Sequence, residues 1–447
     1  MSATNTNSSR LRKYSVRASD WSIPGYGVRS WDVMIRVIFS ASMLFSTSPS
    51  MLAPAQGQNS TPPAAISADA ENVRAEIRSI ENVLPKIPDR GAALFSLAQR
   101  YAHLGELETS LRLLKECMAL ESGFVPDPRN QPTLRRLETN TEFRNLLAQA
   151  RRRYSPVHRS QVAFTVPAED LFPEGLAVDA SNGLFYMGSM HHKEIVKFRL
   201  NKRVADFVRQ GVYDLSPVGG VHVDPADHSV WAATDAGVKQ RPELLHFDTK
   251  GKLLERYASP GKMPHDLNDL VLRGTREIFT TDTEGNHVYR FDRLSHTFAE
   301  MKLWRPVFNP NGIALSHDCN LLFIADSLGV IRVDLQTNDS SDVDPGAHGT
   351  LSGIDGLYWH SHELIGVQYG TGEYRVMRWK LSPDGRKVVD SEVLEYNTDM
   401  ISDPTTGAIR GDNFYFIANT GIYNLENDRI LDPTKLEPVH IAVVPLK

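Results

Sequence analysis

The chain has 447 residues, of which 41% are hydrophobic and 23% charged, so it is long enough for two or three domains with sizeable cores. A formal net charge of −5 gives no reason to expect a nucleic-acid partner. The two cysteines, Cys117 and Cys319, argue against a disulfide framework and are too few for a cysteine-based metal site.

The first 55 residues lack the pattern of a folded domain. Residues 1–33 are rich in Ser, Asn, Thr and Arg, without apolar periodicity. From Met34, a basic residue, an apolar stretch too short for a membrane span and an Ala-Pro-Ala step at 53–55 follow in the order of a secretory signal peptide. We predict a true start at Met34, cleavage after Ala55, no membrane span in the mature chain, and a periplasmic or secreted protein. A disordered tail with one weak apolar segment is the alternative.

Helical patterning follows a stretch at 56–68 whose composition predicts a flexible linker. The predicted helical domain covers residues 69–155, and within it residues 89–120 form a tetratricopeptide-like pair of helices with a turn at Gly105. A single unit of this kind cannot bury both of its own faces. The domain is therefore expected either to bind a protein partner or to pack on its neighbour.

From residue 160 onward, short apolar or alternating runs are separated by Gly, Asp, Asn and Pro, which predicts an all-β domain over 160–447. A similar run recurs about every 45 residues, the size of a four-stranded propeller blade. The strand-like residues 160–166 are expected to complete the last blade. The predicted fold is an all-β six-bladed β-propeller with a small N-terminal α-helical, tetratricopeptide-like domain.

One position is equivalent in all six repeats, just before the Gly that opens most of the runs. It is occupied by Glu174, Gly219, Asn268, Asn311, Asp355 and Thr406. The innermost strands of a propeller run along its axis, so residues at matching ends of these strands converge. Two carboxylates and two amides in that place suit a hard divalent cation.

Turn formation is the competing explanation, because Asn-Gly and Asp-Gly are common turn dipeptides. Glu-Gly has no such preference, and Asp269 stands in place of Gly after Asn268. We therefore predict a shared metal site formed by Glu174, Asn268, Asn311 and Asp355. Ca²⁺ is the expected ion, with Zn²⁺, Mn²⁺ or Mg²⁺ as alternatives.

The motifs around these four residues are "PEG", "LND", "PNG" and "IDG". Over about residues 165–447 the array resembles the senescence marker protein/gluconolactonase/regucalcin-like (LRE-like) family, whose wider relatives include paraoxonases and diisopropylfluorophosphatase. The resemblance implies a six-bladed propeller in which these four residues hold the metal and Asp355 also serves as proton acceptor or nucleophile. Sugar-lactone members carry an Arg two residues before the blade-three Asn, where this chain has Asp266. Since a carboxylate cannot supply the cationic fork of Arg, this departure weakens the case for an aldonolactone.

These features predict an exported, metal-dependent hydrolase that acts on a small lactone or carboxylic ester. The cation would polarise the carbonyl group, and Asp355 would activate water as general base. His265 and Asp269 flank the blade-three ligand, and His191 and His192 follow a blade-one strand; these four are the further candidates to orient water or substrate. The alternatives are a non-catalytic ligand- or metal-binding propeller that engages a partner through its helical domain, and a phosphotriesterase-like hydrolase.

Overall fold

The computed structural model describes residues 63–236, 241–261 and 265–447, all within the second of two compact units of the chain, Ile35–Lys447. The predicted start, signal peptide and first part of the linker lie outside the described residues. No helix in the described ranges is long and apolar enough to cross a membrane.

Helices precede the sheets. They are α1 (Pro63–Val83), η2 (Leu84–Lys86), α2 (Arg90–His103), α3 (Leu107–Ala119), η3 (Pro132–Leu137) and α4 (Thr141–Arg153). Helix α1 begins at Pro63, inside the stretch predicted as a linker, and Pro is well tolerated in the first turn of a helix. Gly105 adopts a φ of 80° in the turn between α2 and α3, which favours glycine. Whether this pair is a true tetratricopeptide unit, and the exact domain boundaries, stay predictions.

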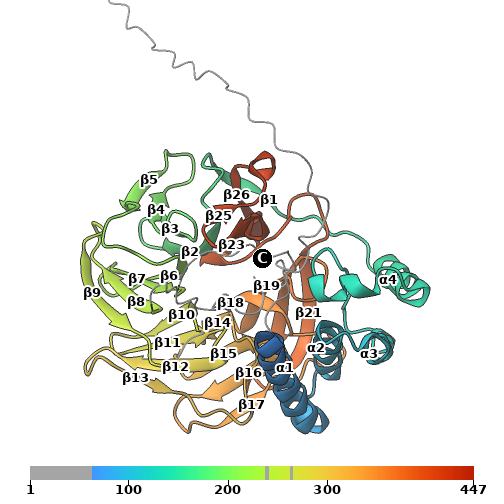
Figure 1. The fold of residues 1–447 in the computed structure, drawn as a ribbon. Coiled ribbons are helices and arrows are strands. Elements are labelled where there is room, and N and C mark those ends of the chain that lie inside the picture. The colour runs from blue at the N-terminus through green and yellow to red at the C-terminus, as the bar shows by residue number, and fades with distance from the viewer. Residues whose placement is uncertain (1–62, 237–240, 262–264) are drawn as a thin grey trace, which may run out of the picture. The chain divides into compact units, whose positions relative to one another are not determined.

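Six four-stranded antiparallel sheets follow around a common axis (Figure 1). The first three are β2 (Pro173–Asp179), β3 (Leu184–Ser189), β4 (Ile195–Phe198) and β5 (Ala205–Val208); β6 (Val218–Val223), β7 (Val230–Thr234), β8 (Glu243–Phe247) and β9 (Leu253–Ala258); and β10 (Leu267–Arg273), β11 (Glu277–Asp282), β12 (His287–Asp292) and β13 (Thr297–Glu300). The next two are β14 (Ile313–Leu315), β15 (Leu321–Asp326), β16 (Gly329–Asp334) and β17 (Ser340–Asp342); and β18 (Ile354–His360), β19 (Glu363–Gln368), β20 (Arg375–Leu381) and β21 (Val388–Tyr396).

The sixth sheet closes the ring. It has the order β1-β26-β23-β22, formed by β1 (Gln161–Val166), β26 (Val439–Pro445), β23 (Asn413–Ile417) and β22 (Gly407–Arg410). Its loop carries η4 (Ile422–Asn424), the short pair β24 (Leu425–Glu426) and β25 (Arg429–Ile430), and η5 (Pro433–Lys435). Innermost strands β2, β6, β10, β14, β18 and β22 contact one another in this order, and β22 contacts β2. The six-bladed propeller is confirmed, including its completion by the strand at 161–166.

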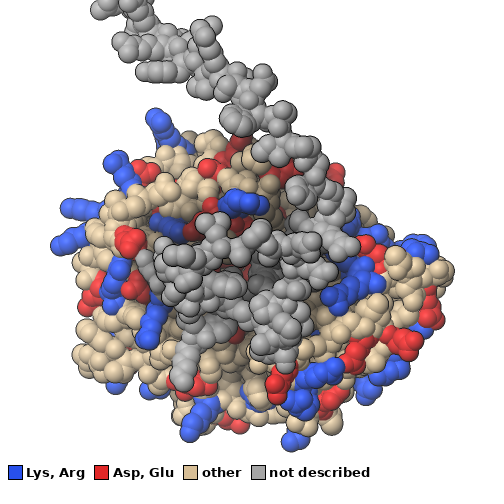
Figure 2. All heavy atoms as spheres, viewed as in Figure 1, with Lys and Arg blue, Asp and Glu red and all other residues tan. Residues whose placement is uncertain are grey.

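Hydrophobic clusters fill the space between each pair of neighbouring sheets. A further cluster holds the helices together and includes Phe308 and Leu328 from the segments around β14 and β15. Because of this cluster, the helices share a core with the fourth blade. The surface is a separate matter: on the face shown in Figure 2, basic and acidic side chains are intermixed.

Buried hydrogen bonds also fix the helices to the fifth blade. The Asp89 carboxylate accepts from the α2 backbone at Ala92 N (3.0 Å) and also from Thr350 Oγ1 (2.5 Å) and Leu351 N (3.1 Å). Gly372 lies so close to the helical segment that an added Cβ would be 1.6 Å from Val125 O. The helical region therefore packs on the propeller, as one of the two sequence-based interpretations expected.

Candidate metal and catalytic site

Three of the four candidate ligands lie at irregular positions of the innermost strands, and Asn311 lies just before β14. The pairing of β2, β6, β10 and β18 with their neighbours shifts register between Pro173 and Leu176, Val218 and Val221, Leu267 and Leu270, and Ile354 and Leu357. Glu174, Asn268 and Asp355 are each the first residue within such a shift. Because bulges re-aim side chains and often border active sites, the repeated irregularity explains why these positions leave the ordinary strand alternation.

The Gly that follows most of these positions allows neighbouring inner strands to approach. An added Cβ would lie 2.2 Å from Gly219 O at Gly175, 2.5 Å from Asn268 O at Gly220 and 2.5 Å from Asp355 O at Gly312. Each of these contacts joins one blade to the equivalent position of the next blade. The repeated Gly is therefore required by strand packing, and the six aligned positions form one ring.

At two places in the ring, a side chain forms a hydrogen bond between neighbouring blades. Asp269, which replaces the Gly of the other repeats, accepts a hydrogen bond from Ile313 N of the next inner strand at 3.4 Å. The Thr406 hydroxyl donates to Glu174 O and joins the sixth blade to the first. Asp269 thus lies beside the predicted ligand Asn268 and bridges the third and fourth blades.

Glu174 and Asp355 form a pair of interacting carboxyl groups. Burial raises the pKa of Glu174 well above its usual range, and the charge of Asp355 raises it further. Burial also raises the pKa of Asp355 to about 6, while hydrogen bonding with Thr405 and Asn311 opposes this rise. Thr405 Oγ1 also donates to Glu174 Oε1 at 3.4 Å. Within the described ranges, neither carboxyl group forms an ion pair with a basic side chain.

Asn311 supplies a neutral oxygen to the same place. Its side chain is close enough to Asp355 to lower the pKa of that carboxyl group, and its Oδ1 is buried without a hydrogen-bond partner among the described residues. Asn268 is half-buried, and its main chain lies against Gly220. An unpaired amide oxygen beside two carboxylates lacking a counter-charge matches the oxygen ligands of a divalent cation. These residues therefore fit such an ion.

Further acidic groups surround the pair. Asp266 and Asp269 both raise the pKa of Glu174. Burial raises the pKa of Asp269 to about 7, and burial together with nearby carboxylates raises that of Asp266 well above its usual range. The Asp266 carboxylate accepts from Glu284 N at 2.7 Å. This concentration of negative charge attracts cations and repels anionic substrates.

A cavity of about 130 Å³ adjoins the site on the side of the helices. Helix α2 contributes Phe95, Ser96, Gln99 and Arg100, and the segment before and within η3 contributes Asn130, Gln131, Pro132 and Thr133. The propeller contributes Asn311, Asp326 and Tyr369, among others. Since Asn311 is a candidate ligand, the helices form one wall of a cavity that reaches the candidate metal site.

Sequence reasoning missed three groups beside the carboxylate pair. Thr405 contacts both carboxyl groups, as described above. Tyr369 and Tyr423 have pKa values raised first by burial and then by charges that include Asp355 and Glu174. Two of the three carried a signal, since Thr405 adjoins the aligned residue Thr406 and Tyr369 directly follows β19, the second strand of its blade. Tyr423 lies in a loop outside the repeat.

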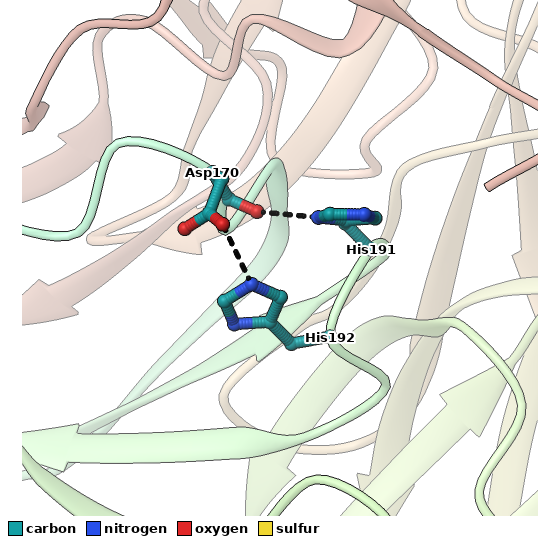
Figure 3. Close-up of side chains that lie close together, drawn as sticks. All are labelled: Asp170, His191 and His192. Carbon is teal, nitrogen blue, oxygen red and sulfur yellow. Dashed lines mark hydrogen bonds and ion pairs between the residues drawn. The ribbon is translucent and has the colours of Figure 1, made fainter. Parts of the chain in front are cut away.

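The other predicted residues lie in different surroundings. His265 is buried, with Nδ1 3.2 Å from Ser259 Oγ and 3.4 Å from Asp282 Oδ2. His191 and His192 lie in the loop between β3 and β4 and contact Asp170 (Figure 3). Their contacts in the described structure include none of the four axial residues. Roles for His265, His191 and His192 in catalysis stay predictions.

Comparisons with known proteins find solved structures at low sequence identity. No family model matches the chain, and no curated protein matches it in sequence. Among solved structures, a gluconolactonase from Xanthomonas campestris is 14% identical, with 66% of this chain and 98% of that chain covered and a TM-score of 0.45. Regucalcin, a calcium-binding protein from Agrobacterium tumefaciens, is 17% identical (64% and 95% covered, TM-score 0.44). A PQQ-bound aldose sugar dehydrogenase from Streptomyces coelicolor is 15% identical (65% and 99% covered, TM-score 0.45).

Proposed function

We propose that this protein is a divalent-metal-dependent hydrolase of small lactones or carboxylic esters, related to the senescence marker protein/gluconolactonase/regucalcin-like propellers. The observation that carries the proposal is the enclosed pair Glu174 and Asp355, which has no basic partner in the described structure and lies beside the unpaired oxygen of Asn311. Glu174, Asn268, Asn311 and Asp355 would hold the ion, with Ca²⁺ as the expected one.

Asp355 is the proposed general base. When bound, the cation would polarise the substrate carbonyl group and stabilise negative charge on its oxygen. The Asp355 carboxylate takes a proton from water as the water oxygen attacks the carbonyl carbon. When the carbon–oxygen bond to the leaving group breaks, Asp355 returns this proton to the leaving oxygen. Burial raises the pKa of Asp355 to about 6 in the metal-free protein, and a bound cation would favour the ionised carboxylate that accepts the proton.

The cavity supports a small substrate without negative charge. Its volume of about 130 Å³ lies well below the ~300 Å³ at which drug-sized pockets begin. Amide and hydroxyl groups line it, including Gln99 and Gln131 from the helical region. Arg100 and Asp326 also line it, and they are paired with Glu76 and Arg305, respectively. The surrounding carboxylates disfavour anions. On this proposal the helices take part in substrate selection.

The test is a panel of lactones, aryl esters and phosphotriesters, assayed with Ca²⁺, Mn²⁺ or Zn²⁺ and after removal of metal by a chelator. Wild-type protein should hydrolyse lactones or carboxylic esters only when metal is present. Asp355→Asn should lower kcat by roughly 10²–10⁴-fold. Asp390→Asn, which changes an exposed carboxylate of β21, should leave kcat unchanged. Turnover confined to phosphotriesters would favour the phosphotriesterase alternative, and no turnover would refute the hydrolase.

We also propose that the protein is exported by a signal peptide that starts at Met34 and is cleaved after Ala55. The support is the charge and hydrophobicity pattern of residues 34–55. Intact mass of the native protein should correspond to a chain that begins near Gln56. A mass that includes residues 2–33 would contradict both the proposed start and the cleavage.

A further inference from the structure

A second group of potential metal ligands lies outside the axial site. Asp170 belongs to the segment just before β2, while His191 and His192 lie in the loop that joins β3 to β4. His192 Nε2 is 3.1 Å from Asp170 Oδ2, and His191 Nδ1 is 3.0 Å from Asp170 O (Figure 3). One ligand atom from each of the three residues lies within 4.8 Å of the other two. Two segments of the first blade thus bring two imidazoles and a carboxylate to one point.

This spacing is close to that of a zinc site. Ligand atoms at 2.0–2.2 Å from a tetrahedral Zn²⁺ are roughly 3.3 Å apart. The His192–Asp170 distance already matches this value within a few tenths of an ångström. Imidazole nitrogen and carboxylate oxygen are donors that Zn²⁺ and related transition metals prefer over the all-oxygen shells of Ca²⁺. The cluster therefore favours a different class of ion from the axial site.

Glu194 provides an independent observation. Its Oε1 is 3.1 Å from Nδ1 of His192, the ring nitrogen that does not face Asp170. Histidines that bind metals commonly donate their second N–H to a carboxylate, which fixes the ring and the tautomer. Glu194 is only 13% exposed and is therefore a well-placed positioning residue.

The cluster is accessible, and the adjacent lysine is directed to another partner. The side chains of Asp170 and His192 are 41% and 22% exposed, so an ion can enter from solvent. Lys193 lies between His192 and Glu194 in the sequence, but its ammonium group pairs with Asp428 at 2.7 Å. The two carboxylates of Asp170 and Glu194 therefore retain negative charge that would favour a cation.

We propose that Asp170, His191 and His192 bind a divalent transition metal of the Zn²⁺ class, with Glu194 as a positioning residue for His192. Three ligands leave at least one coordination position open to water or to a further ligand. The ion would join the segment before β2 to the β3–β4 loop. Glu174 of the axial site lies four residues after Asp170, near the start of β2. The second ion would therefore fix the start of the strand that carries Glu174.

The experiment is a Zn²⁺ titration of the metal-free full chain by calorimetry and elemental analysis, with Ca²⁺ in excess to fill oxygen-ligand sites. Wild-type protein should bind one more equivalent of Zn²⁺ than His192→Gln or His191→Gln. Glu194→Gln should retain the equivalent with roughly 10–100-fold weaker affinity. His287→Gln is the matched control, because His287 also has its Nδ1 near a glutamate, Glu300 at 2.9 Å. This control should bind as the wild type does.

Equal Zn²⁺ stoichiometry in wild type and His192→Gln would overturn the proposal, as would the absence of Zn²⁺ binding by wild type. In either case His192 is simply an ion-paired histidine between two carboxylates. Thermal unfolding of the metal-free proteins separates loss of ligand from loss of fold, since the variants should unfold cooperatively near the wild-type temperature. None of these measurements uses hydrolytic activity, so they are independent of the proposed function.

Discussion

Two places in the propeller each enclose a pair of carboxyl groups, but within the described ranges a basic side chain pairs with the carboxyl groups in only one of the two places. In the fourth blade, Arg305 contacts Asp326 at 2.6 Å and Asp342 at 2.9 Å, and the Arg305 and Asp326 side chains are fully buried. At the axis, Glu174 and Asp355 interact without a basic side chain paired to either in the described structure. A buried charge is costly unless it is paired. The fourth blade contains its own counter-charge, whereas the axial pair requires protons or a cation from solution.

Removing the internal counter-charge should have the largest effect on stability. Arg305→Met leaves Asp326 and Asp342 enclosed without this positively charged partner, which should lower the free energy of unfolding by about 3–5 kcal/mol. Chemical denaturation of the metal-free protein measures this change. Arg209→Met, at a site 78% exposed and paired with Asp206, should change stability by less than about 1 kcal/mol. If the two substitutions lowered stability equally, Arg305 would not be the counter-charge that stabilises the fourth-blade carboxylates.

Removing the carboxyl groups at the axis should raise the stability of the metal-free protein, whereas removing Arg305 should lower it. Glu174→Gln with Asp355→Asn removes two carboxyl groups that have no basic partner in the described structure, so the metal-free protein should become more stable at pH 8 by about 1–3 kcal/mol. The same denaturation experiment tests it. The control pair, Glu116→Gln with Asp390→Asn, changes exposed groups and should have little effect. A clear loss of stability in the axial variant would show that its charges are already compensated within the protein.

The cavity is lined by residues of both the axial site and the fourth blade, and a substitution in its helical wall tests whether the helices contribute to function. Its lining includes both Asn311 and Asp326, with Gln99 of α2 on its wall. Loss of one hydrogen bond to substrate is worth about 1 kcal/mol, so Gln99→Leu should raise KM for a hydroxylated substrate about fivefold with little change in kcat. Gln149→Leu introduces the same change on the exposed face of α4 and should leave KM unchanged. An unchanged KM in Gln99→Leu would exclude this residue from substrate contact.

Asp403 shows a third way to hold an enclosed carboxyl group. Burial raises its pKa to about 7, although backbone N–H groups of residues 420–422 lower it. A raised pKa means that the native state retains a proton that the unfolded state has already released. The contribution of this group to stability is therefore present below pH 4 and is lost as the pH rises through about 7. Between about pH 5 and pH 8, wild type should lose about 2–3 kcal/mol more of its free energy of unfolding than Asp403→Asn, as measured by chemical denaturation at the two pH values.

Much of the fold and the axial array could be predicted because both repeat. Glu174, Asn311 and Asp355 recur at the blade interval, and the adjacent glycines recur because each lies against the next inner strand. The same regularity predicted the closing strand β1. The role of Gly as a packing residue could not be separated from turn formation until the neighbouring backbone was known.

The remaining features depend on contacts between distant and non-repeating segments. Asp89 caps the N-terminus of α2 and also accepts a hydrogen bond from Thr350, more than 250 residues away. Gln99 lines the cavity from a helix that belongs to no blade. Tyr423 comes from a loop outside the repeat. No spacing rule connects such residues. Asp170, His191 and His192 are likewise brought together by two loops, and only the adjacent histidines were visible as a motif.

The central claim is that the axial carboxylates and amides bind a divalent cation, and Ca²⁺ calorimetry of chelator-treated protein tests it most directly. Wild-type protein should bind one equivalent of Ca²⁺, and the variant Glu174→Gln with Asp355→Asn should lose this equivalent while remaining folded. Absence of binding in wild type, or equal binding in the two proteins, would contradict the claim.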